Sequence, residues 1–327
     1  MQKGEVIKGY TILQDFIVAG GRSKISFASK GGKEYFIKEF LSPKYPVPDS
    51  PGSERVKEQK RKACEEFEKH HLELNDKIRS KVSYGGNLVF DVDFFRSGPC
   101  YYKVTEKVDT DSPTCDEISR YSFDQILLIA KCVCHSLKIM HDLNIVHGDL
   151  KPDNILIKKK SSEVYIAKLI DLDDCFFSGN PPIKENLVGT PEYYSPEQAA
   201  YIMDEDGEVD GDTLTLKSDI FTLGIILCEY FTGQKPIIEG KYKTVWDSVD
   251  HGIRLGYTKE INPKIKSLID KMLQKEAKDR PTITEVFNAL KDPKITTTPG
   301  TSLRGDGLTI GRGSLRGQGI GIAKKKE

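Results

Sequence analysis

The stretch from His147 to Asn154 constrains this chain more than any other part of its sequence, and it reads His-Gly-Asp-Leu-Lys-Pro-Asp-Asn. Asp149 is followed two residues later by Lys151 and five residues later by Asn154, so one loop can place a carboxylate, an ammonium group and a metal-binding amide around a single point. A second carboxylate, Asp171, follows on a predicted hairpin strand. A plain polar turn would not need so many matched positions, so we interpret the stretch as a functional site.

These groups suit phosphoryl transfer, which needs a carboxylate to orient the attacking hydroxyl, divalent metal to spread phosphate charge and a cation on the transferred group. The stretch resembles the catalytic loop and metal-binding Asp motif of protein kinases. The resemblance implies that Asp149 orients the acceptor hydroxyl and Lys151 steadies the γ-phosphate of ATP, while Asn154 and Asp171 hold Mg²⁺. Gly148 replaces the usual arginine, as in aminoglycoside kinases and similar small-molecule phosphotransferases, whereas Lys151 is typical of the Ser/Thr protein kinases.

Composition favours a globular protein of about two packed lobes, since 327 residues can bury a large core. Lys+Arg and Asp+Glu are equal at 49 each, so we expect no nucleic-acid or anionic-lipid partner. The seven cysteines are scattered without a Cys-x-x-Cys pair, which indicates reduced thiols. The start of the chain lacks an apolar signal core, and the most apolar helical stretch, residues 220–231, is too short to span a bilayer. We therefore expect a cytoplasmic location and no membrane partner.

The N-terminal region is predicted to form strands over residues 10–18, 24–29 and 33–40, with a Gly-Gly hairpin turn between the last two. The join between the first two strands lies where a kinase carries its glycine-rich loop, but only Gly20 matches that pattern. An ordinary glycine turn would account for this join equally well. The resemblance implies that ATP lies under Ile17 and Ile25.

Lys38 falls on the third strand, where kinases carry the lysine that reaches the α- and β-phosphates of ATP. A solvated strand lysine is the alternative for this residue alone. Phe36 replaces the small residue that normally abuts the adenine, so it narrows the expected pocket. Apolar residues three or four apart predict a helix over residues 54–78. Its Glu68 is our choice for the partner of Lys38, with two further glutamates as rivals, Glu65 and Glu66.

Two more strands are predicted over residues 88–95 and 100–108, and the second ends in a sequence that resembles the hinge between kinase lobes. There the resemblance implies that the backbone of Glu106 and Val108 binds adenine and that Thr105 gates the space behind it. A plain strand end is the alternative. Leu156 would lie on the other side of the adenine.

The segment from Gly189 to Glu197 resembles the end of a kinase activation segment, with Ser-Pro-Glu in place of Ala-Pro-Glu. By this resemblance Thr190 touches the catalytic Asp and Lys, and Glu197 pairs with Arg280 to brace the larger lobe. Asp219 opens a helix and would hold the catalytic-loop backbone. A capping box at residues 122–125 begins the helix that leads to the catalytic loop.

Two segments lie outside these motifs. The acidic run over residues 204–212 lacks the Gly and Glu positions of a calcium-binding loop and is interpreted as a solvated insertion.

From residue 291 the chain is rich in Pro, Thr and Gly, has a net charge of +5 and repeats Ser-Leu-Arg-Gly at an interval of twelve residues. This tail is either a flexible solubilising segment or a segment for docking a partner or for autophosphorylation.

Together the motifs predict an α+β, two-lobed protein-kinase-like fold with a small β-rich N-lobe (residues 1–108), a larger helical C-lobe (109–290) and a basic tail (291–327). The predicted activity is transfer of the ATP γ-phosphate to serine or threonine hydroxyls of protein substrates, with ATP and Mg²⁺ as cofactors. Three alternatives stay open: a pseudokinase scaffold, a small-molecule phosphotransferase and an interaction protein that acts through its tail. The sequence resembles eukaryotic-type Ser/Thr kinases of bacteria, including kinases of tellurium-resistance phosphorylation operons.

Overall fold

The computed structural model describes residues 2–83, 86–108, 112–161, 164–184, 186–187, 189–295, 308–310 and 322–324. Contacts within the chain divide it into two units. Unit 1 comprises Met1–Gly85 and Val89–Asp109, and unit 2 comprises Gly86–Leu88 and Thr110–Glu327. None of the helices in the described part of the chain combines the length and the apolar character needed to cross a membrane.

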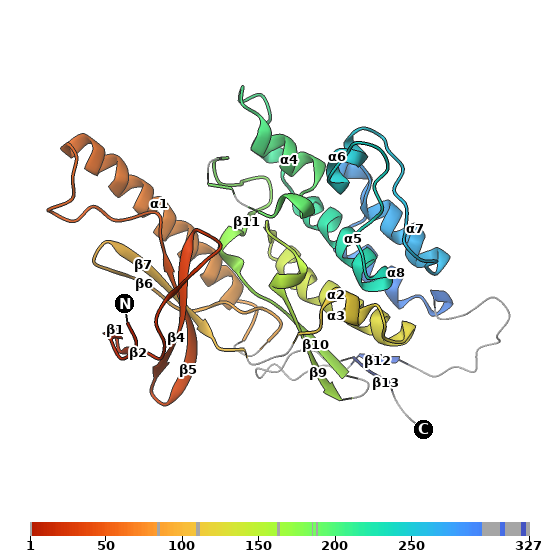
Figure 1. Ribbon diagram of the computed structural model, residues 1–327, viewed down its shortest axis with the longest axis horizontal. Helices are drawn as coiled ribbons and strands as arrows, with labels where there is room; N and C mark the ends of the chain where they lie inside the picture. Colours follow the sequence, from red (N-terminus) through yellow and green to blue (C-terminus); the bar gives the residue numbers. More distant parts are fainter. Residues whose placement is uncertain are drawn as a thin grey trace. The chain divides into compact units, whose positions relative to one another are not determined.

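Unit 1 is an antiparallel sheet with one long helix (Figure 1). Its strands pair in the order β1-β2-β4-β5-β7-β6, and β3 also pairs with β4. The elements are β1 (Val6–Ile7), β2 (Tyr10–Ile12), β3 (Ile17–Ala19), β4 (Ser23–Lys30), β5 (Lys33–Phe40), α1 (Glu54–Arg79), β6 (Asp91–Ser97) and β7 (Cys100–Glu106). The Gly31-Gly32 turn between β4 and β5 has φ of +59° and +76°, which glycine adopts without strain.

The prediction of one strand over residues 10–18 is wrong. Ile12 pairs with Ala28, and Ile17 pairs with Ile25. The chain therefore advances five residues from Ile12 to Ile17, while its partner β4 advances only three between the paired positions. The two extra residues cannot join the ladder, and the strand splits into β2 and β3. The predicted helix over residues 54–78 is confirmed as α1, which Ser53 caps by accepting from the Val56 amide.

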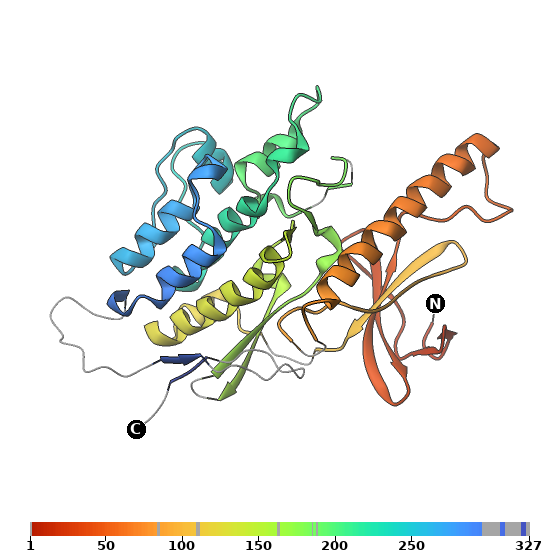
Figure 2. The same ribbon diagram turned by 180° about the vertical axis from the view of Figure 1, so that it is seen from behind.

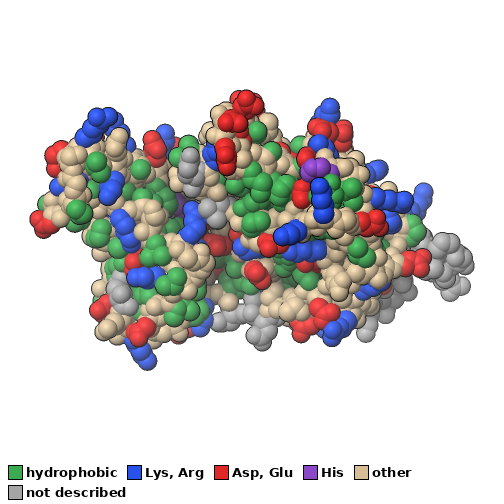
Figure 3. Space-filling model, turned by 45° about the horizontal axis from the view of Figure 1, so that its top comes forward, with side chains coloured by type: hydrophobic (Ala, Val, Ile, Leu, Met, Phe, Trp, Pro, Cys, Tyr) green, Lys and Arg blue, Asp and Glu red, His purple; other side chains and the backbone are tan. Residues whose placement is uncertain are grey.

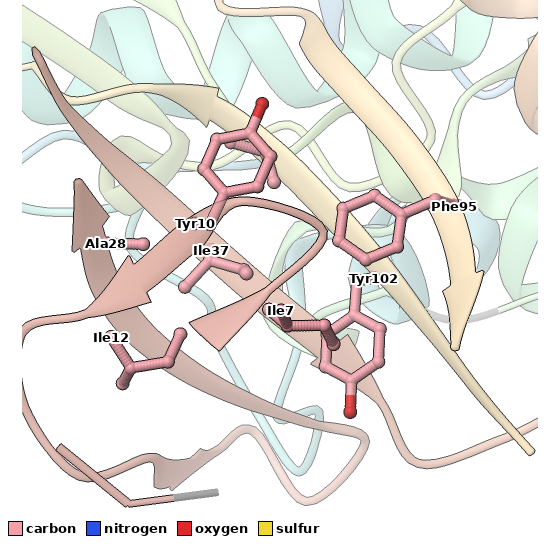
Figure 4. Close-up of a cluster of buried hydrophobic side chains, with 8 residues drawn as sticks. Ile7, Tyr10, Ile12, Ala28, Ile37, Phe95 and Tyr102 are labelled. Carbon is pink, nitrogen blue, oxygen red and sulfur yellow. The ribbon is translucent and has the colours of Figure 1, made fainter. Parts of the chain in front are cut away.

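One face of the unit 1 sheet carries an apolar core, drawn in Figure 4. Tyr10 stacks on Phe95 with the ring centroids 6.2 Å apart, and Ile37 is fully buried between neighbouring strands. A second cluster joins Phe40 of β5 and Cys64 of α1 to Tyr101 of β7. This second cluster fixes α1 against the sheet.

Unit 2 is mainly helical. Its helices are α2 (Cys115–Ile118), α3 (Phe123–His141), α4 (Pro196–Met203), α5 (Leu216–Thr232), α6 (Val245–Asp250), α7 (Pro263–Met272) and α8 (Ile283–Lys291). Its strands are β8 (Ile145–Val146), β9 (Ile155–Ser161), β10 (Val164–Leu169), β11 (Phe176–Phe177), β12 (Leu308–Ile310) and β13 (Ile322–Lys324). Short 3₁₀ turns include η1 (Pro152–Asn154), η2 (Leu172–Asp174), η3 (Pro191–Tyr193), η4 (Gly211–Thr213), η5 (Ala277–Asp279) and η6 (Pro293–Ile295).

Helix α5 is the centre of unit 2. Every residue from Ser218 to Thr232 is buried, as expected for a helix that is apolar on all sides. It lies between α3 and α7 (Figure 1), and Gly224 lets α7 approach because a β-carbon there would lie 3.0 Å from Met272. Gly233, with φ of +85°, ends the helix. Seen from behind, the antiparallel β9–β10 hairpin lies against α3 (Figure 2).

The packed part of unit 2 continues past residue 290. Ile295 is buried, and the Asn262 side chain donates to its carbonyl oxygen at 3.0 Å. Farther along, β12 pairs with β13 in antiparallel register. Most of the tail, including nearly all of the twelve-residue repeat, lies outside the described residues.

Candidate active site

A carboxylate near the start of α5 holds the backbone of the catalytic loop. Asp219, which is 2% exposed, accepts from the backbone amide of His147 at 2.8 Å and from that of Gly148 at 3.3 Å. The ring Nε2 of His141, the last residue of α3, lies 3.0 Å from the same carboxylate. Two buried helices therefore fix the loop entrance through one carboxylate, as the resemblance implied for Asp219.

Four of the residues predicted from the sequence come together in unit 2. The Lys151 ammonium group donates to Asp149 Oδ2 at 2.6 Å and to Thr190 Oγ1 at 2.9 Å. Thr190 in turn donates to Asp149 Oδ1 at 3.0 Å. Asn154 donates through Nδ2 to the carbonyl oxygen of Asp149 at 2.8 Å. Both carboxylate oxygens of Asp149 are thus oriented, and the whole side chain is only 10% exposed.

The oxygen ligands expected for Mg²⁺ come from Asn154 and Asp171. Because Nδ2 of Asn154 bonds to Asp149, its amide oxygen is the atom turned toward other groups. The amide of Ile170 donates to the carbonyl oxygen of Asn154 at 3.0 Å, which fixes the chain just before Asp171. Asp171 has a left-handed backbone, with φ of +57° and ψ of +61°. A carboxylate and an amide oxygen are the donors that Mg²⁺ prefers, so these residues fit that ion.

Two side-chain interactions anchor the chain that follows Thr190, through Tyr193 and through the carbonyl oxygen of Pro191. The Tyr193 hydroxyl donates to both oxygens of Glu229, at 3.2 and 3.0 Å, and the Lys235 ammonium lies 4.0 Å from the Tyr193 ring centroid. Burial is the main cause that raises the pKa of both Tyr193 and Glu229. Trp246 donates to the carbonyl oxygen of Pro191 at 3.1 Å. These contacts could not be predicted from the sequence, because Glu229 lies in a helix whose apolar run gives no sign of a buried carboxylate.

The predicted Glu197–Arg280 pair is present. Arg280 donates to Glu197 through two nitrogens, at 2.6 and 2.8 Å, and its side chain is fully buried. It also donates to the carbonyl oxygens of Gln274, Lys275 and Lys217. The pair joins α4 to the turn before α8.

In unit 1, Lys38 is half-buried on β5, opposite Ile25 of β4 and Lys103 of β7. Phe36 pairs with Thr105, so these two residues are cross-strand neighbours. Thr105 donates to the carbonyl oxygen of Glu106 at 3.4 Å. The roles of these residues toward a nucleotide stay predictions.

Glu68 of α1 accepts from the Tyr101 hydroxyl at 2.5 Å and lies 3.9 Å from the Arg96 guanidinium. Its rivals Glu65 and Glu66 are exposed. The pairing of Lys38 with one of these glutamates stays a prediction.

The other predicted nucleotide contacts lie at strand ends. Ile17 pairs with Ile25 across β3 and β4, and Ile17 is 58% exposed. Gly20 has φ of +57° in the turn between these strands, and a β-carbon there would meet no atom within 4 Å. Val108 follows β7, and Leu156 lies half-buried on β9 of unit 2.

The two units define an α+β fold of the protein-kinase type. Unit 1 supplies an antiparallel sheet and one long helix, and unit 2 supplies the helices and the loop that carries Asp149, Lys151 and Asn154. The family model described as "Protein kinase domain" matches residues 54–290. The chain therefore belongs to the protein kinase family.

Curated relatives agree with this assignment. The chain is 27% identical to the ovarian-specific serine/threonine-protein kinase Lok of Drosophila melanogaster over 67% of this chain and 43% of the relative. It is 34% identical to the putative serine/threonine-protein kinase R436 of Acanthamoeba polyphaga mimivirus over 48% of this chain and 53% of the relative. It is 29% identical to the serine/threonine-protein kinase pkn3 of Myxococcus xanthus over 50% of this chain and 30% of the relative. The matches thus span about half of these relatives or less.

Proposed function

We propose that this protein transfers the γ-phosphate of ATP to serine or threonine hydroxyls of protein substrates. The observation that carries the proposal is the triangle of Asp149, Lys151 and Thr190, whose three hydrogen bonds are 2.6, 2.9 and 3.0 Å long. It presents one oriented carboxylate and one cation at the same point. These are the two groups that an in-line attack by a hydroxyl on a phosphoryl group requires.

In this proposal Asp149 accepts a hydrogen bond from the substrate hydroxyl, orients it and takes its proton as the new P–O bond forms. Lys151 stabilises the charge on the transferred phosphoryl group, and Lys38 holds the α- and β-phosphates. Asn154 and Asp171 would hold Mg²⁺, which spreads the phosphate charge when bound. Thr190 fixes the Asp149 and Lys151 side chains relative to each other, because its hydroxyl bonds to both.

The finer assignments rest on the same family relationship. Ile17, Gly20, Ile25, Thr105, Leu156 and the backbone of Glu106 and Val108 are proposed to contact the nucleotide, and Glu68 to support Lys38. Protein substrates are proposed because the relatives are named as serine/threonine-protein kinases. A partner for the tail and a cytoplasmic location stay proposals that no contact in the described chain addresses.

Radiolabelled ATP and Mg²⁺, with a generic protein acceptor, provide the test. We expect the wild type to label serine or threonine, and Asp149→Asn to lower the rate at least about a thousandfold, because the isosteric amide cannot take the proton. Asp142→Asn is the matched control, since Asp142 is an exposed carboxylate paired with Lys138 on the last turn of α3.

Three results would contradict the proposal. Equal activity of Asp149→Asn and wild type would remove Asp149 from the chemistry. Nucleotide binding by the wild type without any transfer would favour the pseudokinase scaffold instead. Label that appears only in small molecules, and not in protein, would favour the small-molecule phosphotransferase.

A further inference from the structure

Gln198 of α4 makes a contact that its position in the sequence does not predict. Ser195-Pro196-Glu197-Gln198 has the Ser-x-x-Gln signature of a capping box, in which the glutamine side chain turns back to the serine amide. Ser122 and Gln125 close such a box at the start of α3, as do Thr114 with Glu117 and Thr282 with Glu285. At α4 only the first half of the box forms, with the Gln198 amide donating to Ser195 Oγ at 3.3 Å.

The Gln198 side chain donates instead to the catalytic loop. Its Nε2 lies 2.9 Å from the carbonyl oxygen of Gly148, the residue before Asp149, and Gln198 is only 4% exposed. The carbonyl oxygen that follows, that of Asp149, accepts from Asn154 at 2.8 Å. The peptide carbonyls on both sides of the Asp149 side chain are therefore each held by a buried amide side chain.

The same hydrogen bond lies against the residue before Thr190. A β-carbon on Gly189 would lie 3.2 Å from Gln198 Nε2 and 3.4 Å from the Gly148 oxygen. The Tyr194 hydroxyl donates to the carbonyl oxygen of Gly189 at 3.1 Å. The Gln198 side chain thus bonds to the backbone that carries Asp149 and lies close to the backbone that carries Thr190, and the side chains of Asp149 and Thr190 bond to each other.

We propose that Gln198 is a positioning residue for Asp149: its amide fixes the Gly148–Asp149 peptide unit and couples the start of α4 to the catalytic loop. The inference rests on the proposed function, because it assigns Asp149 to the reaction. Rotation of this peptide unit would swing the Asp149 carboxylate away from Lys151 and Thr190. Reactions that depend on near-attack geometry lose rate steeply with such a displacement.

The test compares Gln198→Met, which keeps the volume but removes the donor, with Gln125→Met, which removes the glutamine of a complete capping box on α3. For Gln198→Met we expect kcat to fall roughly ten- to a hundredfold with KM for ATP and for the protein acceptor unchanged within about twofold. Hydrogen–deuterium exchange in the peptide that contains residues 147–154 should become faster. Gln125→Met should lower thermal stability at α3 and leave both quantities at the wild-type level.

Gln198→Glu is a second variant, for use if Gln198→Met does not fold. It keeps the shape of the side chain but turns a carboxylate toward the Gly148 carbonyl oxygen, so we expect at least as large a loss of kcat. A kcat within twofold of wild type, or catalytic-loop exchange unchanged in a folded variant, would overturn the proposal. If the wild type itself transfers no phosphate, the proposed function fails. The exchange comparison then still decides whether Gln198 holds the loop.

Discussion

A β-carbon on Gly148 would lie 2.3 Å from the carbonyl oxygen of Asp174, closer than two such atoms can approach. Gly148 also has φ of +79°, which side-chain-bearing residues rarely adopt. Together the contact and the backbone angle allow only glycine before the catalytic aspartate. The arginine that many protein kinases carry here could enter this loop only if the backbone of η2 moved.

The first prediction separates these two causes. Gly148→Ala should lower the free energy of unfolding by roughly 2 kcal/mol more than Gly207→Ala. Gly207 has the same φ of +79°, but a β-carbon there would meet no atom within 4 Å. Both variants carry the left-handed strain of roughly 1–2 kcal/mol, so the difference reports the contact with Asp174. Urea unfolding measures it, and equal values would show that the loop shifts at little cost.

The second prediction concerns the hydroxyl of Thr190. Thr190→Val keeps the shape but removes the group that bonds to Asp149 and Lys151, so we expect kcat to fall roughly tenfold or more. Thr190→Ser keeps the hydroxyl and should retain most of the rate. Steady-state kinetics with a protein acceptor distinguish the two. If Thr190→Val kept the wild-type rate while Thr190→Ser lost it, packing of the methyl group would be the cause and the hydrogen bonds would not.

The catalytic loop could be predicted from the sequence because its chemistry is local: the spacing of Asp149, Lys151 and Asn154 within one short loop already limits how far apart they can lie. Thr190 and Asp219 were placed only through the resemblance to a family, since nothing in the residues themselves indicates a contact across 41 or 72 positions. Gln198 could not be predicted, because its sequence signature indicates a local cap and only the fold brings Gly148 within reach. The break between β2 and β3 likewise depends on pairing register, which composition does not encode.

The third prediction concerns the Glu197–Arg280 ion pair. Arg280→Met should destabilise unit 2 by roughly 3–5 kcal/mol, because it leaves the Glu197 carboxylate, only 13% exposed, without its cation. The double variant Glu197→Gln/Arg280→Met should regain part of that loss, because it no longer buries an unpaired charge. Denaturant unfolding of both variants gives the comparison. A double variant less stable than Arg280→Met would show that the carboxylate is satisfied by Ser218, which donates to it at 2.8 Å.

The segment between Asp171 and Thr190 forms an ion pair with the residue that ends α4. Lys184, in this segment, binds Asp204 at the end of α4, with its ammonium group 2.7 Å from Oδ2. The amides of Gly207 and Val209 donate to the same carboxylate. Lys184 and the Val209 amide hold the pKa of Asp204 below its ordinary value of 3.8, so the stabilisation is complete above that pH and is lost as the pH falls below it. Figure 3 shows further acidic side chains gathered on the exposed loop that follows.

The last prediction is that activity does not depend on phosphorylation of this segment. The partner arginine for a phosphate is excluded at Gly148, and Ser178 is the only hydroxyl side chain between Asp171 and Thr190 in the sequence. Ser178 already accepts from the Leu216 amide at 3.3 Å, at the start of α5. Protein treated with phosphatase, and the Ser178→Ala variant, should therefore keep the wild-type kcat on an added substrate.

Lys184→Met should instead lower kcat roughly three- to tenfold, because the segment loses its ion pair with Asp204. Lys264→Met is the control: it breaks an exposed pair with Asp292 and should leave kcat nearly unchanged. A large loss of rate on dephosphorylation, mapped to this segment and restored by rephosphorylation, would show that a phosphate and not Asp204 orders it.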